Sequence, residues 1–116
     1  MAKKSKTKSP FVGRWRITWM DMWGQDFVDA EVEGYFAFAA NGGGDFQFGY
    51  VRGDIDYRDA VRDGKPSIEF SWDGNDEMDA AQGRGWAVSN GDEIEGMIVF
   101  HQGDESAFKA KRKKGK

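Results

Sequence analysis

Large apolar side chains recur at every second position along most of this chain, and short glycine-rich turn sequences separate these stretches. In residues 11–20, for example, Trp15, Ile17 and Trp19 alternate with polar residues. A β-strand points successive side chains to opposite faces, so a period of two is typical of strands with one buried face. We therefore expect an all-β protein built from short antiparallel strands.

Residues 28–39 are predicted to form the second strand. Val32, Phe36 and Phe38 share one parity there, and Gly34 interrupts the run. A helix is the alternative for this stretch, because alanine and glutamate favour helices. The alternation of the two phenylalanines, together with the glycine, favours the strand.

The segment from residue 45 to residue 61 is too long for one ordinary strand. Gly49 and Gly53 lie inside it and indicate a bend or a bulge. Two alternatives stay open, one bent strand or two shorter strands. Downstream, turn sequences separate four more alternating stretches, at residues 68–72, 83–88, 94–100 and 106–110.

Seven or eight such strands with short turns describe an antiparallel up-and-down meander. A meander of this size can close into a small barrel, and closure pairs its two edge strands. A two-layer sandwich of similar size is the alternative. We expect residues 10–110 to form the barrel, with a disordered basic tail at residues 1–9 and a second basic tail at residues 111–116.

Charge is divided unevenly between the tails and the body. Residues 1–9 carry four lysines, and residues 109–116 carry five lysines and one arginine. The 99 residues between them hold seven basic and 20 acidic residues, which leaves a net charge of −13. Basic tails can contact phosphates, but these tails lack aromatic residues for base stacking, and the acidic body repels nucleic acid. Nucleic acid is therefore not the expected partner.

Several classes of site are disfavoured by composition. The chain has no cysteine, which excludes disulfides and thiolate metal sites, and one histidine, which argues against a zinc site. No apolar run follows the basic N-terminus, so neither a secretory signal nor a membrane span is expected. We expect a cytoplasmic protein without metal or cofactor, and its oligomeric state is left open.

No set of residues converges on a catalytic site in the sequence. His101 could serve as a base, but Ser71, Ser89 and Ser106 do not lie in a nucleophile motif. Residues 73–79 alternate oxygen-bearing side chains, yet they lack the glycine and the final glutamate of a calcium-binding loop. We interpret this acidic segment as a hairpin turn and do not expect an enzyme.

The segment from Phe11 to Trp15 contains Gly13-Arg14-Trp15. It is similar to the Gly-x-Trp that opens the first strand in lipocalins, avidins and fatty-acid-binding proteins. This resemblance to calycin-like barrels implies an up-and-down barrel with Trp15 at its closed end. In lipocalins an arginine near the last strand packs over that tryptophan, and the resemblance implies this barrel-closing role for Arg112.

Large rings on the inward faces are the candidate binding residues. Gly83, Gly85 and Gly96 share these faces, and each leaves room either for a facing ring or for a ligand. A barrel of eight strands is wide enough to be filled by side chains or to hold one small ligand. The candidate residues for a small apolar or aromatic ligand are Trp19, Phe36, Phe38, Phe70, Trp72 and Phe100.

Two function hypotheses follow. The first is a non-catalytic module that binds a small apolar or aromatic ligand in the barrel. The second is an interaction protein that contacts a macromolecule through its basic tails or its acidic surface. An open cavity in the interior would favour the first hypothesis, and a filled core would favour the second.

Overall fold

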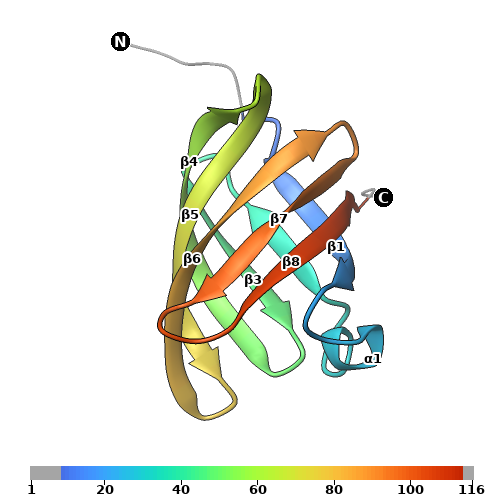
Figure 1. Cartoon of the computed structure of the whole chain (residues 1–116), viewed down its shortest axis with the longest axis vertical. Coiled ribbons are helices and arrows are strands. Elements are labelled where there is room, and N and C mark those ends of the chain that lie inside the picture. The colour runs from blue at the N-terminus through green and yellow to red at the C-terminus, as the bar shows by residue number, and fades with distance from the viewer. Residues whose placement is uncertain (1–8, 114–116) are drawn as a thin grey trace.

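The computed structural model describes residues 9–113, and in that part of the chain eight antiparallel strands and one short helix follow one another (Figure 1). Each strand pairs with the next, and the last strand pairs with the first to close a barrel. The predicted all-β meander and its closure are confirmed, with eight strands. The elements are β1 (Gly13–Met20), α1 (Gln25–Val28), β2 (Tyr35–Phe38), β3 (Gly43–Phe48), β4 (Val51–Arg62), β5 (Lys65–Asp76), β6 (Asp79–Asn90), β7 (Glu93–Phe100) and β8 (Glu105–Arg112).

Residues 28–39 do not form one strand. The helix α1 ends at Val28, β2 begins at Tyr35, and Val32 lies exposed in the loop between them. The Asp29 carboxylate accepts a hydrogen bond from the Gly34 backbone N–H at 2.8 Å. This N–H therefore bonds to a side chain and not to the backbone of a neighbouring strand. The prediction of one strand over residues 28–39, in which Val32 shares a face with Phe36 and Phe38, is thereby corrected.

Residues 45–61 form two strands, β3 and β4. The turn between them contains Gly49, whose φ of 58° lies in the left-handed region. A Cβ on Gly49 would also lie 2.4 Å from the Phe27 ring of α1, so both the turn and this contact require glycine. Gly53 lies within β4 and faces the interior.

A bulge in β1 changes which side chains face inward. Ile17 opposes Ala110 and Trp19 opposes Lys109, so the register shifts by one residue between Ile17 and Trp19. As a result Met20 is buried, whereas Trp19 is 44% exposed on the outer face. The expectation that Trp19 lines the interior is corrected by this bulge.

Rings that contact one another occupy the interior. The Phe36 ring centroid lies 4.5 Å from that of Phe108, and the Trp72 centroid lies 5.0 Å from that of Phe100. The inward glycines face these rings: a Cβ on Gly85 would lie 2.4 Å from the Phe70 ring. At Gly85 a facing ring therefore takes the space, at Gly83 the Trp72 ring and the Val99 backbone take it, and at Gly96 the backbone of β6 takes it.

At one end of the barrel, Trp15 on β1 lies opposite Arg112 on β8. The Trp15 ring is fully buried, and its Nε1 donates a hydrogen bond to the Phe11 carbonyl at 2.9 Å. The Arg112 guanidinium lies 4.2 Å from the Trp15 ring centroid and donates to the carbonyls of Pro10 and Val12 at 2.7 and 2.9 Å. The last strand, β8, ends at Arg112, two residues beyond the domain boundary expected at residue 110. The tails at residues 1–8 and 114–116 lie outside the described residues.

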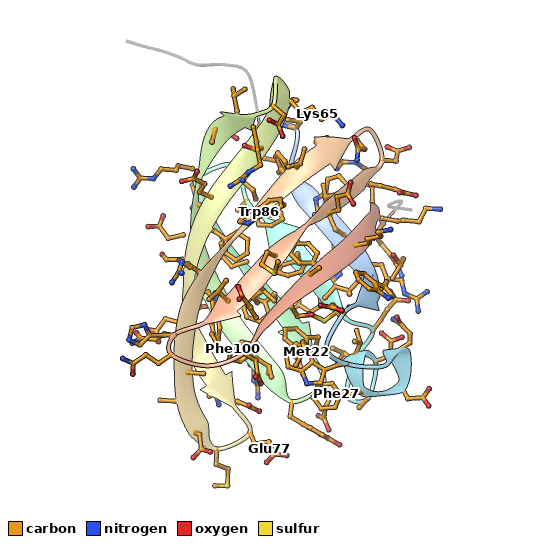
Figure 2. The ribbon with its side chains drawn as sticks, in the orientation of Figure 1. Met22, Phe27, Lys65, Glu77, Trp86 and Phe100 are labelled. Carbon is orange, nitrogen blue, oxygen red and sulfur yellow. The ribbon has the colours of Figure 1, made fainter. Side chains whose placement is uncertain are left out.

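The α1 segment packs aromatic rings at the other end of the barrel. Trp23 stacks on Phe27 with ring centroids 6.1 Å apart, and it lies 5.1 Å from Phe48 and 6.0 Å from Phe100. Figure 2 shows Phe27, Met22 and Phe100 toward this end, Lys65 toward the other, and Trp86 between them.

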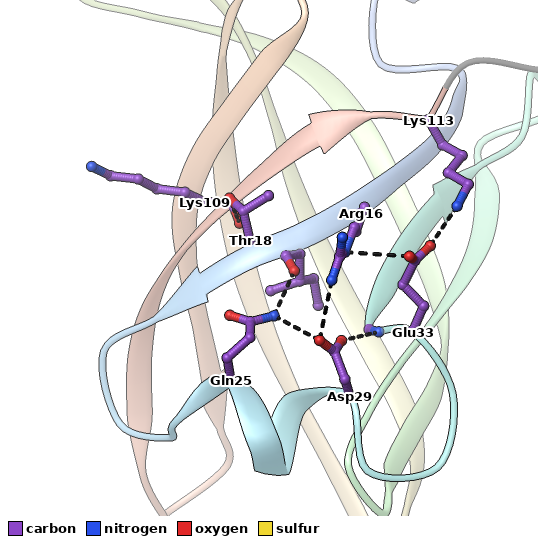
Figure 3. A network of polar contacts seen from close by, with 9 residues as sticks. Arg16, Thr18, Gln25, Asp29, Glu33, Lys109 and Lys113 are labelled. Atoms are coloured by element: carbon purple, nitrogen blue, oxygen red, sulfur yellow. Dashed lines mark hydrogen bonds and ion pairs between the residues drawn. The ribbon is translucent and has the colours of Figure 1, made fainter.

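A polar network fastens the α1 segment to β1 and to the end of β8 (Figure 3). Asp29 accepts a hydrogen bond from the Gly34 N–H and forms an ion pair with Arg16, with 3.3 Å between its Oδ2 and the Arg16 Nη2. Arg16 in turn lies 3.4 Å from the Glu33 carboxylate, which pairs with Lys113 at 2.6 Å. The network therefore connects three segments that are far apart in the sequence.

Asp29 is the carboxyl group most tightly held in this network. Partial burial alone would raise its pKa. Hydrogen bonds from the Gly34 N–H, Gln25 and Arg16, together with the positive charge of Arg16, outweigh burial and hold the pKa of Asp29 below its ordinary value of 3.8. The ionised group therefore stabilises the fold above the pKa of the unfolded chain. That stabilisation is lost as the pH falls through the folded pKa.

The variant Asp29→Asn is expected to lower the free energy of unfolding by about 1 kcal/mol near neutral pH, because it removes charge-assisted hydrogen bonds. Urea unfolding followed by tryptophan fluorescence measures the difference from wild type. The difference is expected to shrink as the pH is lowered below 3.8, where the wild-type carboxyl group is also protonated. Glu31→Gln, at an exposed position in the same loop, is the control. A difference that persists undiminished at about pH 2.5 would contradict the role of the ionised group.

Candidate functional site

The outer face of β4 to β7 is hollowed into a groove with a volume of about 650 Å³, which we call the outer groove. Its apolar floor comes from Trp86 on β6 and from Met97 and Val99 on β7, and the inward-facing Gly85 and the buried Phe70 lie beneath it. The outer face of a small barrel is ordinarily polar, because alternate side chains point to solvent. Trp86, Met97 and Val99 are therefore exceptions to this pattern on the outer face of β6 and β7.

Glycines in β6 and β7 let these two strands, which carry the apolar floor, approach each other closely. A Cβ on Gly83 would lie 1.8 Å from the Val99 carbonyl oxygen, and a Cβ on Gly96 would lie 1.9 Å from the Trp86 carbonyl oxygen. Only strands without side chains at these positions can approach so closely and bend. The register then places Trp86 directly opposite Met97 on the outer face.

Six exposed charged side chains, three of each sign, border the apolar floor. Within residues 9–113 none of the six takes part in an ion pair; the four pairs found there involve other residues. The groove therefore presents unpaired charges of both signs around an apolar centre. The six residues are Asp56, Arg58, Arg62, Glu69, Arg84 and Glu105.

Arg62 makes the most specific contact in the groove. Its guanidinium carbon lies 4.1 Å from the centroid of the Trp86 ring, within the range of a cation–π interaction. Arg62 belongs to β4 and Trp86 to β6, so this side chain reaches across β5. Ser67 lies on β5 between them and is only 2% exposed, although its parity is that of the outer face.

A second hollow of about 360 Å³ lies on the other side of the Arg62–Trp86 contact. It shares Arg62, Trp86 and Met97 with the outer groove and extends toward Trp19 on β1. The Lys109 ammonium lies 5.7 Å from the Trp19 ring centroid. The bulge that turns Trp19 outward therefore places it at the far end of this hollow.

The structure separates the residues that the sequence proposed as one binding site. Phe36, Phe38, Phe70 and Trp72 are buried, and Phe100 is partly buried against them, so their rings contact one another in the interior. Trp19 lies outside, in the second hollow. Trp86, which the sequence did not single out, is central to both hollows; its alternation with the inward Gly85 and Ala87 was the available indication that it faces outward.

The acidic residues of the surface do not assemble into a site of known chemistry. Asp45, Asp54 and Asp73 lie directly opposite one another on β3, β4 and β5, an arrangement of like charges that costs stability. Burial, followed by the hydrogen bond that Tyr35 donates to Asp45, raises the pKa of Tyr35 to about 12, so this phenol stays protonated. His101 lies exposed in the turn after β7.

Among residues 9–113 no group of three histidine or acidic side chains is placed to hold a metal ion. In the same part of the chain, no helix is long and apolar enough to cross a membrane. Comparisons with protein-family models, with curated proteins and with solved structures find no match for this chain. The outer groove is therefore interpreted from its own geometry.

Proposed function

We propose that the protein is a non-catalytic binding module that holds an extended segment of a partner protein in its outer groove. One observation carries the proposal: an apolar floor on the outside of the barrel is bordered by charges of both signs that are not paired with one another. A polypeptide segment offers apolar side chains, cations and anions together, so it can satisfy all parts of this surface.

The size and composition of the groove support a peptide-like ligand. A volume of about 650 Å³ lies within the range of ordinary ligand pockets. Tryptophan, methionine and arginine are enriched at protein interfaces and at their energetic centres, and the groove combines Trp86, Met97 and three arginines.

Two other ligand classes have less support. Asp56, Glu69 and Glu105 border the groove and would repel the phosphates of a nucleic acid. An apolar molecule in the interior would have to displace rings such as Phe36 and Phe108, which contact each other. The binding site of the module therefore lies on the outer face of the barrel and not in its interior.

Selection from a phage-displayed library of random peptides on the immobilised full chain tests the proposal. Peptides selected on the wild type are expected to bind at least about tenfold more weakly to Trp86→Ala, because a central aromatic residue is lost. Tyr35→Ala is the matched control, since Tyr35 also carries a stacked arginine, Arg14, with its guanidinium carbon 3.8 Å from the ring centroid. Fluorescence polarisation measures each affinity, and circular dichroism checks that each variant is folded.

Met97→Ala provides a second test that does not depend on how well Trp86→Ala folds. It removes part of the floor while keeping the ring, and it is expected to weaken the same peptides. The proposal is overturned if no peptide is selected, or if the selected peptides bind both groove variants as tightly as the wild type.

A further inference from the structure

We infer that the Trp86 ring is the receptor for an arginine side chain of the partner, and that Arg62 occupies this receptor in the free protein. This inference rests on the proposed function and specifies the chemistry of the partner. Its physical basis is that Arg62 already shows, within the chain, the contact that the partner would make: a guanidinium 4.1 Å from the ring centroid.

Arg62 is held weakly enough to be displaced. Its side chain is exposed, and within residues 9–113 it makes no ion pair and no side-chain hydrogen bond; the stacking on Trp86 is its specific contact. An exposed cation–π contact is a weak interaction in water. A second guanidinium, carried by a ligand with further contacts in the groove, can therefore compete with it.

Displacement of Arg62 would join the two hollows. The outer groove and the second hollow share Arg62, Trp86 and Met97, so the Arg62 side chain lies across their boundary. With Arg62 turned away, the surface would run without interruption across Trp86 toward Trp19. Such a length suits an extended segment that passes over Trp86 with its arginine on the ring.

The charges around the ring favour a cation in place of Arg62. Glu69 lies directly opposite Trp86 on β5, and Glu95 lies on β7 opposite Val88. Once Arg62 leaves, the two hollows are lined by five acidic and four basic side chains, so their balance becomes acidic. The basic ones are Arg58, Arg84, Lys65 and Lys109.

Arginine is favoured over lysine at this receptor for a geometric reason. A planar guanidinium stacks flat on an indole and can still donate hydrogen bonds at its edge, whereas an ammonium is a compact and strongly hydrated charge. Glu69, beside the ring, is a carboxylate that can accept such a bond. The partner segment is therefore expected to carry an arginine flanked by apolar residues.

The test uses N-acetyl-arginine amide as the probe and N-acetyl-citrulline amide as its neutral isostere. Binding is followed through the indole N–H signals of the five tryptophans in nitrogen-15 correlation spectra, with the Trp86 signal assigned from Trp86→Phe. In Arg62→Ala the arginine probe is expected to shift the Trp86 signal and to bind about threefold more tightly than in the wild type, because the competitor is gone. The citrulline probe is expected to leave that signal unchanged.

Two internal controls separate this effect from a general one. The Trp15 indole is buried and donates to the Phe11 carbonyl, so its signal should not respond to either probe. Arg14→Ala removes a stacked arginine on β1 and β2, away from the groove, and should leave the affinity at Trp86 unchanged.

The inference is overturned if Arg62→Ala binds the arginine probe no better than the wild type, or if citrulline shifts the Trp86 signal equally. It is also overturned if library peptides that need Trp86 contain no arginine. This last result would leave the proposed function standing. If the peptides bound the groove variants Trp86→Ala and Met97→Ala as tightly as the wild type, the proposed function itself would be contradicted.

Discussion

Gly96→Ala is expected to abolish stable folding. A Cβ at this position would lie 1.9 Å from the Trp86 carbonyl oxygen and 2.7 Å from the Ala87 Cα. Both are backbone atoms of the paired strand, so no side-chain rotation can relieve the overlap. Gly96 also pairs with Phe108 on its other side, which prevents β7 from moving away as a unit. We expect a loss of more than about 4 kcal/mol, which is most of the stability of an ordinary small domain.

Thermal and urea unfolding followed by circular dichroism measure this loss. Gly24→Ala is the matched control, because no atom lies within 4 Å of the position that its Cβ would occupy. That variant is expected to stay within about 0.5 kcal/mol of the wild type. If Gly96→Ala unfolded with the midpoint of the wild type, the close approach of β6 and β7 that shapes the outer groove would be wrong.

Trp15→Ala is expected to lower the free energy of unfolding by about 3–5 kcal/mol, whereas Trp19→Ala is expected to cost less than about 1 kcal/mol. Trp15 is fully buried, accepts the stacked Arg112 on its ring and donates to the Phe11 carbonyl. Its removal leaves a large cavity in the core. Trp19 lies four residues along the same strand and is 44% exposed, so little packing is lost there.

Urea unfolding of the two variants, followed by far-ultraviolet circular dichroism, gives the comparison. The pair tests the bulge in β1 directly, because strict alternation would bury both rings. Equal losses for the two variants would show that Trp19 faces the interior and that the second hollow does not end at its ring.

Because the binding site lies outside a filled barrel, different residues serve stability and binding. The rings in the interior supply stability, and the charged residues that border the groove can be changed without opening the core. Arg62, Glu69 and Arg84 are exposed, and the ring on which Arg62 stacks, Trp86, is itself partly exposed. Substitutions of these charges are therefore expected to alter recognition more than stability, which makes the groove accessible to mutational tests.

Where the structure departs from the expectation, the cause is local and identifiable. The stretch at residues 28–39 contains alanine and glutamate, whose propensities suit a helix or a loop as well as a strand, and the Asp29 hydrogen bond to Gly34 decided for the loop. The bulge in β1 leaves no mark in the sequence pattern, because Thr18 and Trp19 are both ordinary strand residues. A pattern of period two cannot show where one extra residue is inserted.

What the sequence determined by itself was the meander of strands, since alternating rings and glycine-rich turns suit no helical fold. That the meander closes into a barrel rather than folding into a sandwich was decided by the pairing of β8 with β1. The sequence also showed that glycines share the inward faces of the strands with large aromatic rings. The tertiary structure alone decided that rings and neighbouring backbone fill the spaces at these glycines, that Trp19 faces outward, and that Arg62 reaches Trp86 across β5. These features depend on the register between strands that are distant in the chain, and register is set by the packing of the whole barrel rather than by any one segment.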